Sequence, residues 1–112
     1  NTFPRSRATV AVKDKSQQRP EDLEVAARCL YQAIVCLDTP EECEGFLRDL
    51  CTPAELQALI DRWTVVRMLR QGLPYREIHD LTGVSVTTIG RVARFLADGF
   101  GGYQRVADRL EL

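Results

Sequence analysis

Apolar residues recur every three or four positions along most of this 112-residue chain, which is the spacing of one face of an α-helix. The sequence shows no run of alternating apolar and polar residues, the pattern typical of a β-strand. The apolar spacing therefore predicts an all-α fold with six helices. The segments that we expect to be helical are 21–37, 40–50, 53–71, 74–81, 86–97 and 103–110.

Residues that favour helix ends stand at several of these boundaries. Thr39 and Thr52 each precede a proline, and a glutamate follows each threonine three positions later. A threonine N-cap, a proline at the first helical position and a glutamate that reaches back form a common helix start. Gly72 can end the third helix in a left-handed conformation. The boundaries are thus predicted by local chemistry as well as by the apolar pattern.

The first predicted helix carries a broad apolar face. One small chain cannot easily cover a face of this width, so the pattern indicates a subunit interface and a homodimer. The residues of this face are Leu23, Ala26, Ala27, Leu30, Tyr31, Ile34 and Leu37.

Segment 75–96 predicts two short helices joined by a tight turn, the arrangement of a helix-turn-helix. Gly83 lies where such a turn needs a positive φ, and Ser85 can cap the second helix. Apolar residues fall at the positions that pack the two helices together, and these are Ile78, Val84, Ile89 and Val92.

The second helix of this pair has short side chains in its first turn. A recognition helix enters the major groove by its amino end, where hydroxyl groups can reach base edges or phosphates. The methyl groups of Val86 and Thr87 can contact a thymine methyl, and arginines on both helices can contact phosphates, which position a protein without selecting sequence. The candidate DNA-contacting residues are Arg76, His79, Ser85, Val86, Thr87, Thr88, Arg91 and Arg94.

The net charge is only −1, but the charges are segregated along the chain. Residues 1–20 hold five basic residues and one acidic residue, residues 21–61 hold two basic and ten acidic residues, and residues 62–112 hold eight basic and five acidic residues. This distribution suits a protein with one side that faces a polyanion. We therefore predict a flexible basic arm over 1–20 and one helical dimerisation and DNA-binding domain over 21–112.

Other classes of protein receive little support from the sequence. No apolar run is long enough to span a bilayer, and residues 1–18 lack the apolar core of a signal peptide, so we expect a cytoplasmic protein without membrane contact. We expect no cofactor and no enzymatic activity, because no paired acid and base, activated nucleophile or metal cluster is evident.

The four cysteines do not have zinc-site spacing, and we expect thiols in a reducing compartment, with a redox switch or an inter-subunit disulfide as the alternative. These cysteines are Cys29, Cys36, Cys43 and Cys51.

Several of these segments together resemble the Trp-repressor superfamily, and within it the YerC/YecD branch of Trp-repressor-related proteins. The resemblance covers residues 30–110 and is strongest over 46–96. It implies six helices and an intertwined dimer in which both subunits share one core. The segments that carry it are LCTPAE at 50–55, Arg62 with VVRMLRQG at 65–72, YREIHDLTGVSVTTIGR at 75–91 and GFGGY at 99–103.

The resemblance also implies a ligand pocket, because a Trp repressor holds the ligand's indole between two arginines. Those positions correspond to Arg62 and Arg91, and Thr52 matches a pocket threonine. Val92 and Phe95 replace a glycine and a serine of the repressor, and their side chains can fill the space that a tryptophan needs. We therefore expect tryptophan binding to be absent or weak.

The resemblance further implies DNA contacts by Arg76 and His79 and by the turn of helix at 86–88. Gly90 replaces a contacting threonine, so a contact is lost there.

The leading hypothesis is a transcriptional regulator that binds double-stranded DNA as a homodimer. A second hypothesis is a repressor gated by a small-molecule effector, an aromatic corepressor similar to an amino acid. A third is a protein-interaction module with a vestigial helix-turn-helix, which the acidic stretch 21–61 favours.

Overall fold

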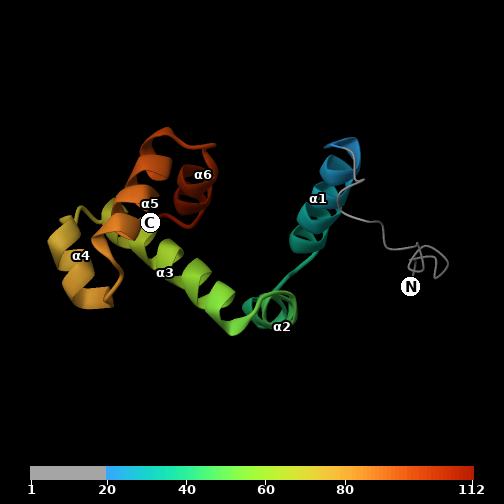
Figure 1. Cartoon of the computed structure of the whole chain (residues 1–112), viewed down its shortest axis with the longest axis horizontal. Helices are drawn as coiled ribbons and strands as arrows, with labels where there is room; N and C mark the ends of the chain where they lie inside the picture. The colour runs from blue at the N-terminus through green and yellow to red at the C-terminus, as the bar shows by residue number, and fades with distance from the viewer. Residues whose placement is uncertain (1–19) are drawn as a thin grey trace. The chain divides into compact units, whose positions relative to one another are not determined.

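The computed structural model describes residues 20–112 and shows six α-helices and no strand in that range (Figure 1). The prediction of an all-α, six-helix fold is therefore confirmed. The arm predicted over 1–20 lies outside the described residues, apart from the backbone of Pro20. The helices are α1 (Pro20–Val35), α2 (Pro40–Leu50), α3 (Pro53–Arg70), α4 (Tyr75–Thr82), α5 (Val86–Asp98) and α6 (Gly102–Arg109).

The chain divides within α2, between Cys43 and Glu44, into two compact units, which are described separately. The first unit contains α1 and the start of α2. No described residue of α1 is buried in this single chain, and Leu23 and Tyr31 remain 53% and 58% exposed. The apolar face of α1 has no cover within the first unit. The single domain predicted over 21–112 stays a prediction.

Helix α1 ends two residues before its predicted boundary. The amide of Cys36 donates to the carbonyls of Gln32 and Ala33, and the amide of Leu37 donates to the carbonyl of Ile34. These short-range bonds tighten the last turn, as commonly occurs where a helix ends. The apolar spacing continues to Leu37, so spacing alone could not reveal this change.

The predicted threonine caps are present at α2 and α3. Thr39 Oγ1 accepts a hydrogen bond from the amide of Glu42 at 3.1 Å. At α3 the capping is reciprocal, because Thr52 Oγ1 accepts from the amide of Glu55 while Glu55 Oε1 accepts from the amide of Thr52. These bonds satisfy amide groups that a helix start leaves without intrahelical partners.

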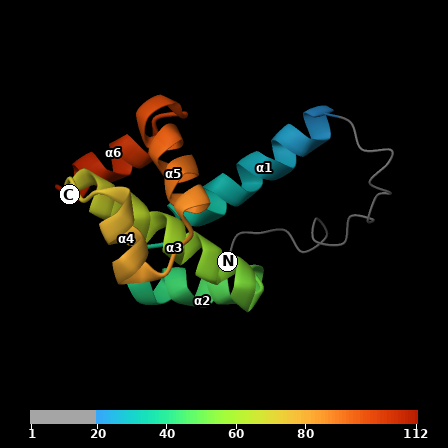
Figure 2. The same cartoon turned by 60° about the vertical axis from the view of Figure 1, so that its left-hand side comes forward.

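The core of the second unit lies where α4 and α5 pack against the second half of α3 (Figure 2). Partly buried side chains extend this core toward α6, and the rings of Trp63 and Tyr103 lie with their centroids 6.4 Å apart. The core holds the α4–α5 pair firmly on α3. Its buried residues are Val65, Val66, Ile78, Val84, Ile89 and Val92.

Arg70, in the last turn of α3, holds the end of the chain in place. Its guanidinium donates to Gln104 Oε1 at 2.6 Å, to Asp108 Oδ1 at 2.8 Å and to the carbonyl of Leu112 at 2.9 Å. Gln104 Nε2 in turn donates to the carbonyl of Leu96 on α5 at 3.1 Å. Helix α6 is thereby tied to both α3 and α5.

Candidate nucleic-acid interface and adjoining pocket

The turn between α4 and α5 is fixed by a left-handed glycine and by side-chain hydrogen bonds. Gly83 has a φ of 76°, as expected, and its amide donates to the carbonyl of His79 at 2.8 Å. Thr82 Oγ1 donates to the carbonyl of Ile78 at 2.6 Å and accepts from the amide of Val84 at 3.0 Å. The turn thus has bonds on both sides of the glycine, which sets the angle between the two helices.

The α4–α5 pair buries one face and exposes the other. The four residues predicted to join the two helices are all buried, with Ile78 and Ile89 fully inaccessible to solvent. At the amino end of α5, Ser85 and Thr87 are exposed and Val86 is 55% exposed. The first turn of α5 is therefore available to a macromolecule that approaches this end of the helix.

Ser85 and Thr88 form the N-cap of α5. Ser85 Oγ accepts a hydrogen bond from the amide of Thr88 at 3.1 Å and donates its proton to Thr88 Oγ1 at 3.0 Å. The Ser85 hydroxyl is thereby committed to the cap, whereas Thr88 Oγ1 still has its own proton to donate. Val86 and Thr87, between the two capping residues, take no part in these bonds and are exposed.

His79 takes part in the turn as well as lying on the exposed side of α4. Its Nδ1 lies 2.7 Å from the carbonyl oxygen of Val84, the residue before the N-cap of α5. The sequence pattern gave no sign of this bond, because it depends on how α4 and α5 meet.

The predicted phosphate-contacting arginines differ in their surroundings. Arg76 on α4 and Arg94 on α5 are exposed. Arg91 is also exposed, but its guanidinium carbon lies 4.7 Å from the centre of the Phe95 ring, one turn later in α5. This cation–π contact directs Arg91 toward a pocket beside α5.

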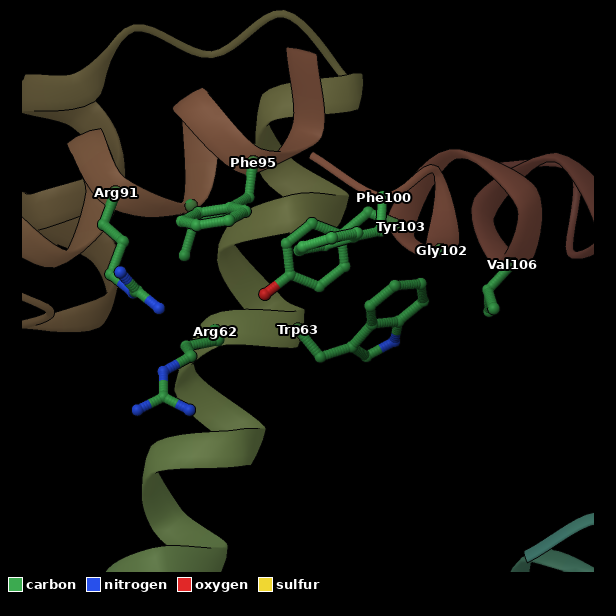
Figure 3. A pocket seen from close by; sticks show the side chains of 9 residues that line it. Arg62, Trp63, Arg91, Phe95, Phe100, Gly102, Tyr103 and Val106 are labelled. Carbon is green, nitrogen blue, oxygen red and sulfur yellow. The ribbon is translucent and has the colours of Figure 1, made fainter. Parts of the chain in front are cut away.

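That pocket, of about 530 Å³, lies between α3, α5 and α6 (Figure 3). Arg62 and Arg91 stand on one side of a group of aromatic rings and Val106 on the other. The two arginines predicted to share a ligand pocket thus line one pocket, which Val92 and Phe95 border without filling. The lining residues are Arg62, Trp63, Arg91, Val92, Phe95, Phe100, Gly102, Tyr103 and Val106.

Thr52, the third predicted pocket residue, does not line this pocket in the single chain. It caps the start of α3, ten residues before Arg62, and a helix rises about 1.5 Å per residue. Sequence reasoning also missed the aromatic wall formed by Trp63, Phe100 and Tyr103. Only the GFGGY segment at 99–103 offered a signal, since its glycines allow a tight turn that brings aromatic residues back onto α3.

Other chemistry is sparse in the part of the chain that the structure describes. Residues 20–112 contain no cluster of three or more side chains suited to a metal ion, and none of their helices is long and apolar enough to cross a membrane. Cys29 and Cys36 are exposed thiols, and Cys43 and Cys51 are half-buried thiols. Within residues 20–112, the α4–α5 pair and the pocket lined by Arg62 and Arg91 are therefore the candidate functional sites.

The order of the six helices, the capped α4–α5 pair and the pocket lined by two arginines define an all-α protein of the Trp-repressor-like class. The family model of the Trp repressor protein matches residues 26–111. The YerC protein of Bacillus subtilis (strain 168), itself uncharacterized, is 44% identical over 82 residues, which are 73% of this chain and 79% of YerC.

Solved structures agree with this match. A TrpR-like protein from Eubacterium eligens superposes with a TM-score of 0.71 at 35% identity, covering 88% of this chain and 97% of that one. A candidate Trp repressor from Staphylococcus aureus superposes with a TM-score of 0.74 at 35% identity, covering 90% and 96%. This chain belongs to the Trp repressor family and is a Trp-repressor-related protein of the YerC type.

Proposed function

We propose that this protein is a sequence-specific transcriptional regulator that binds the major groove of double-stranded DNA as a homodimer, and that it is not an enzyme. Members of its family are DNA-binding regulators. The main support for the proposal is the first turn of α5. Residues 85–87 are exposed there, Ser85 caps the helix, and the buried Ile89 and Val92 hold the helix in place. This is the end of a recognition helix that meets base edges.

The exposed residues divide into two roles in this proposal. Val86 and Thr87 contact base edges, because their side chains are short, exposed and at the helix end that enters the groove. Arg76 and Arg94 contact phosphates. Ser85 caps the helix end, and Thr88 Oγ1, whose proton is free, donates a hydrogen bond to the DNA backbone. Arg91, stacked on Phe95, contributes positive charge nearby.

A homodimer would place two such helix ends in successive major grooves, roughly 34 Å apart. The exposed apolar residues of α1 support this assembly, because a lone chain leaves Leu30, Tyr31 and Ile34 in contact with water. Leu59 and Ile60, in the first half of α3, are also exposed and would join the shared core.

Measuring the affinity of the purified chain for duplex DNA over a range of salt concentrations tests the proposal. We expect binding at low salt. The logarithm of the association constant should then fall linearly with the logarithm of the salt concentration, because binding releases counterions from the phosphates. Absence of binding to every duplex in dilute buffer would contradict the proposal and favour a protein-interaction module.

The pocket beside α5 favours a second candidate, a regulator gated by an aromatic anion. Two guanidinium groups beside aromatic walls suit a ligand with a carboxylate and a flat apolar body. We propose that tryptophan itself binds weakly or not at all, because the ring of Phe95 already covers one face of the Arg91 guanidinium.

Calorimetric titration of the chain with tryptophan and other aromatic carboxylates separates the two candidates. If the protein is a regulator without an effector, the titrations should give no heat of binding. The aromatic carboxylates should also leave its affinity for DNA unchanged. Saturable binding to the native chain that is lost in Arg62→Gln would instead support gating.

A further inference from the structure

His79 occupies a position from which one ring nitrogen serves the fold and the other can serve a ligand. Its Nδ1 lies 2.7 Å from the carbonyl oxygen of Val84, and a carbonyl oxygen can only accept. Nδ1 must therefore carry a proton and donate it. The residue as a whole is exposed on α4, the first helix of the α4–α5 pair.

This bond decides what Nε2 can do. When the ring is neutral and Nδ1 holds the proton, Nε2 has a lone pair and can only accept. When the ring is protonated, Nε2 donates while Nδ1 keeps its bond to Val84. The alternative neutral form, with the proton on Nε2, would set the lone pair of Nδ1 against the carbonyl oxygen.

We propose that His79 contacts a DNA phosphate only in its protonated form, so that DNA binding takes up a proton at this residue. The inference rests on the proposed function. In a helix-turn-helix the first helix crosses the DNA backbone, so the partner of a side chain exposed on α4 is a phosphate oxygen. A phosphate oxygen only accepts, and the neutral ring fixed by Val84 has no proton to offer it.

The charged neighbours of His79 do not confuse this effect. Arg76 lies one turn before it on the same helix, and Asp80 follows it. This chain has one histidine, and the other charged and titratable groups around it all remain in the His79→Gln variant described below. These groups on α4 and on the elements packed against it are Tyr75, Arg76, Glu77 and Asp80 on α4, Arg91, Arg94 and Asp98 on α5, and Glu55, Asp61, Arg62, Arg67 and Arg70 on α3.

The test is the affinity of the full chain for one duplex between about pH 6 and about pH 8 at constant ionic strength. We expect the affinity of the native chain to fall as pH rises, by up to about tenfold per pH unit for each proton taken up. In His79→Gln the amide nitrogen donates at every pH, so the dependence should be flat. Arg94→Gln is the matched control, since it removes another proposed phosphate contact and should lower affinity without changing the slope.

A second measurement needs no variant. The ring protons of the single histidine report its protonation by NMR, and the midpoint of that titration should move to higher pH when DNA is bound. Binding that is independent of pH, a slope that persists in His79→Gln, or a midpoint that does not rise would overturn this inference and leave the proposed function intact. Absence of DNA binding at every pH would overturn both.

Discussion

Two hydroxyl residues at the start of α5 show how neighbouring side chains can have different roles. Ser85 binds the amide and the hydroxyl of Thr88, so its chemistry is spent on the helix end. Thr87, between Ser85 and Thr88, is exposed, and its methyl and hydroxyl are accessible at this end of α5. The sequence indicated DNA contact for both, because a pattern of short polar residues does not say which of them holds the cap.

This difference gives a paired prediction. Thr87→Ala should weaken binding to a preferred duplex by about 1–3 kcal/mol and relax the choice of base, while leaving the melting temperature unchanged. Ser85→Ala should lower the free energy of unfolding by about 0.5–2 kcal/mol through loss of the cap. Anisotropy titrations and thermal unfolding measure the two effects. Equal effects of both changes on base preference would contradict the assignment.

The angle between α4 and α5 depends on the conformation of the turn that joins them. Gly83 has a φ of 76°, whereas Gly90 lies inside α5, and a methyl group added at either position would meet no atom within 4 Å. Space is therefore equal at the two sites and only the backbone conformation differs. The difference between alanine substitutions at these positions therefore combines the strain of the turn at Gly83 with the helix propensity gained at Gly90.

We expect Gly83→Ala to lower the free energy of unfolding by about 1–2 kcal/mol, because an L-residue is strained in the left-handed region. Gly90→Ala should raise it by about 0.5–1 kcal/mol, since alanine is the better helix former. Urea unfolding without DNA gives both values. A neutral Gly83→Ala would show that the turn can adopt another conformation.

The helices, their caps and the turn could largely be predicted from the sequence, because each depends on residues that lie close together in the chain. The caps at Thr39, Thr52 and Ser85 follow from residues within one turn of each other. The aromatic wall of the pocket could not be predicted in this way, since Trp63 and Tyr103 meet only after α6 folds back onto α3. The bond from His79 to Val84 was missed for the same reason, as it needs the angle between two helices.

The whole molecule, as a single chain, leaves the apolar face of α1 in contact with water. The face predicted on α1 is present, and Leu30 and Ile34 on it remain exposed. Burying such residues contributes roughly 1.5–3 kcal/mol each, a gain that the proposed homodimer would make. We propose that a second copy of this chain covers the apolar face of α1.

Charged substitutions on α1 test this proposal. Leu30→Glu should convert the dimer to monomers in sedimentation equilibrium and weaken DNA binding, because a carboxylate would be buried in the shared core. Val25→Glu is the control, since Val25 lies about 140° away around the helix and is also exposed. A dimer that tolerates Leu30→Glu would place the interface elsewhere.

Selecting duplexes from a random pool with the full chain tests whether this protein reads DNA sequence as a homodimer. We expect enrichment of sites with two-fold symmetry, in which two half-sites lie about 10 base pairs apart. Thr87→Ala should relax the base preference at these half-sites. Recovery of a pool with no preferred sequence, or of half-sites with no fixed spacing, would contradict this proposal.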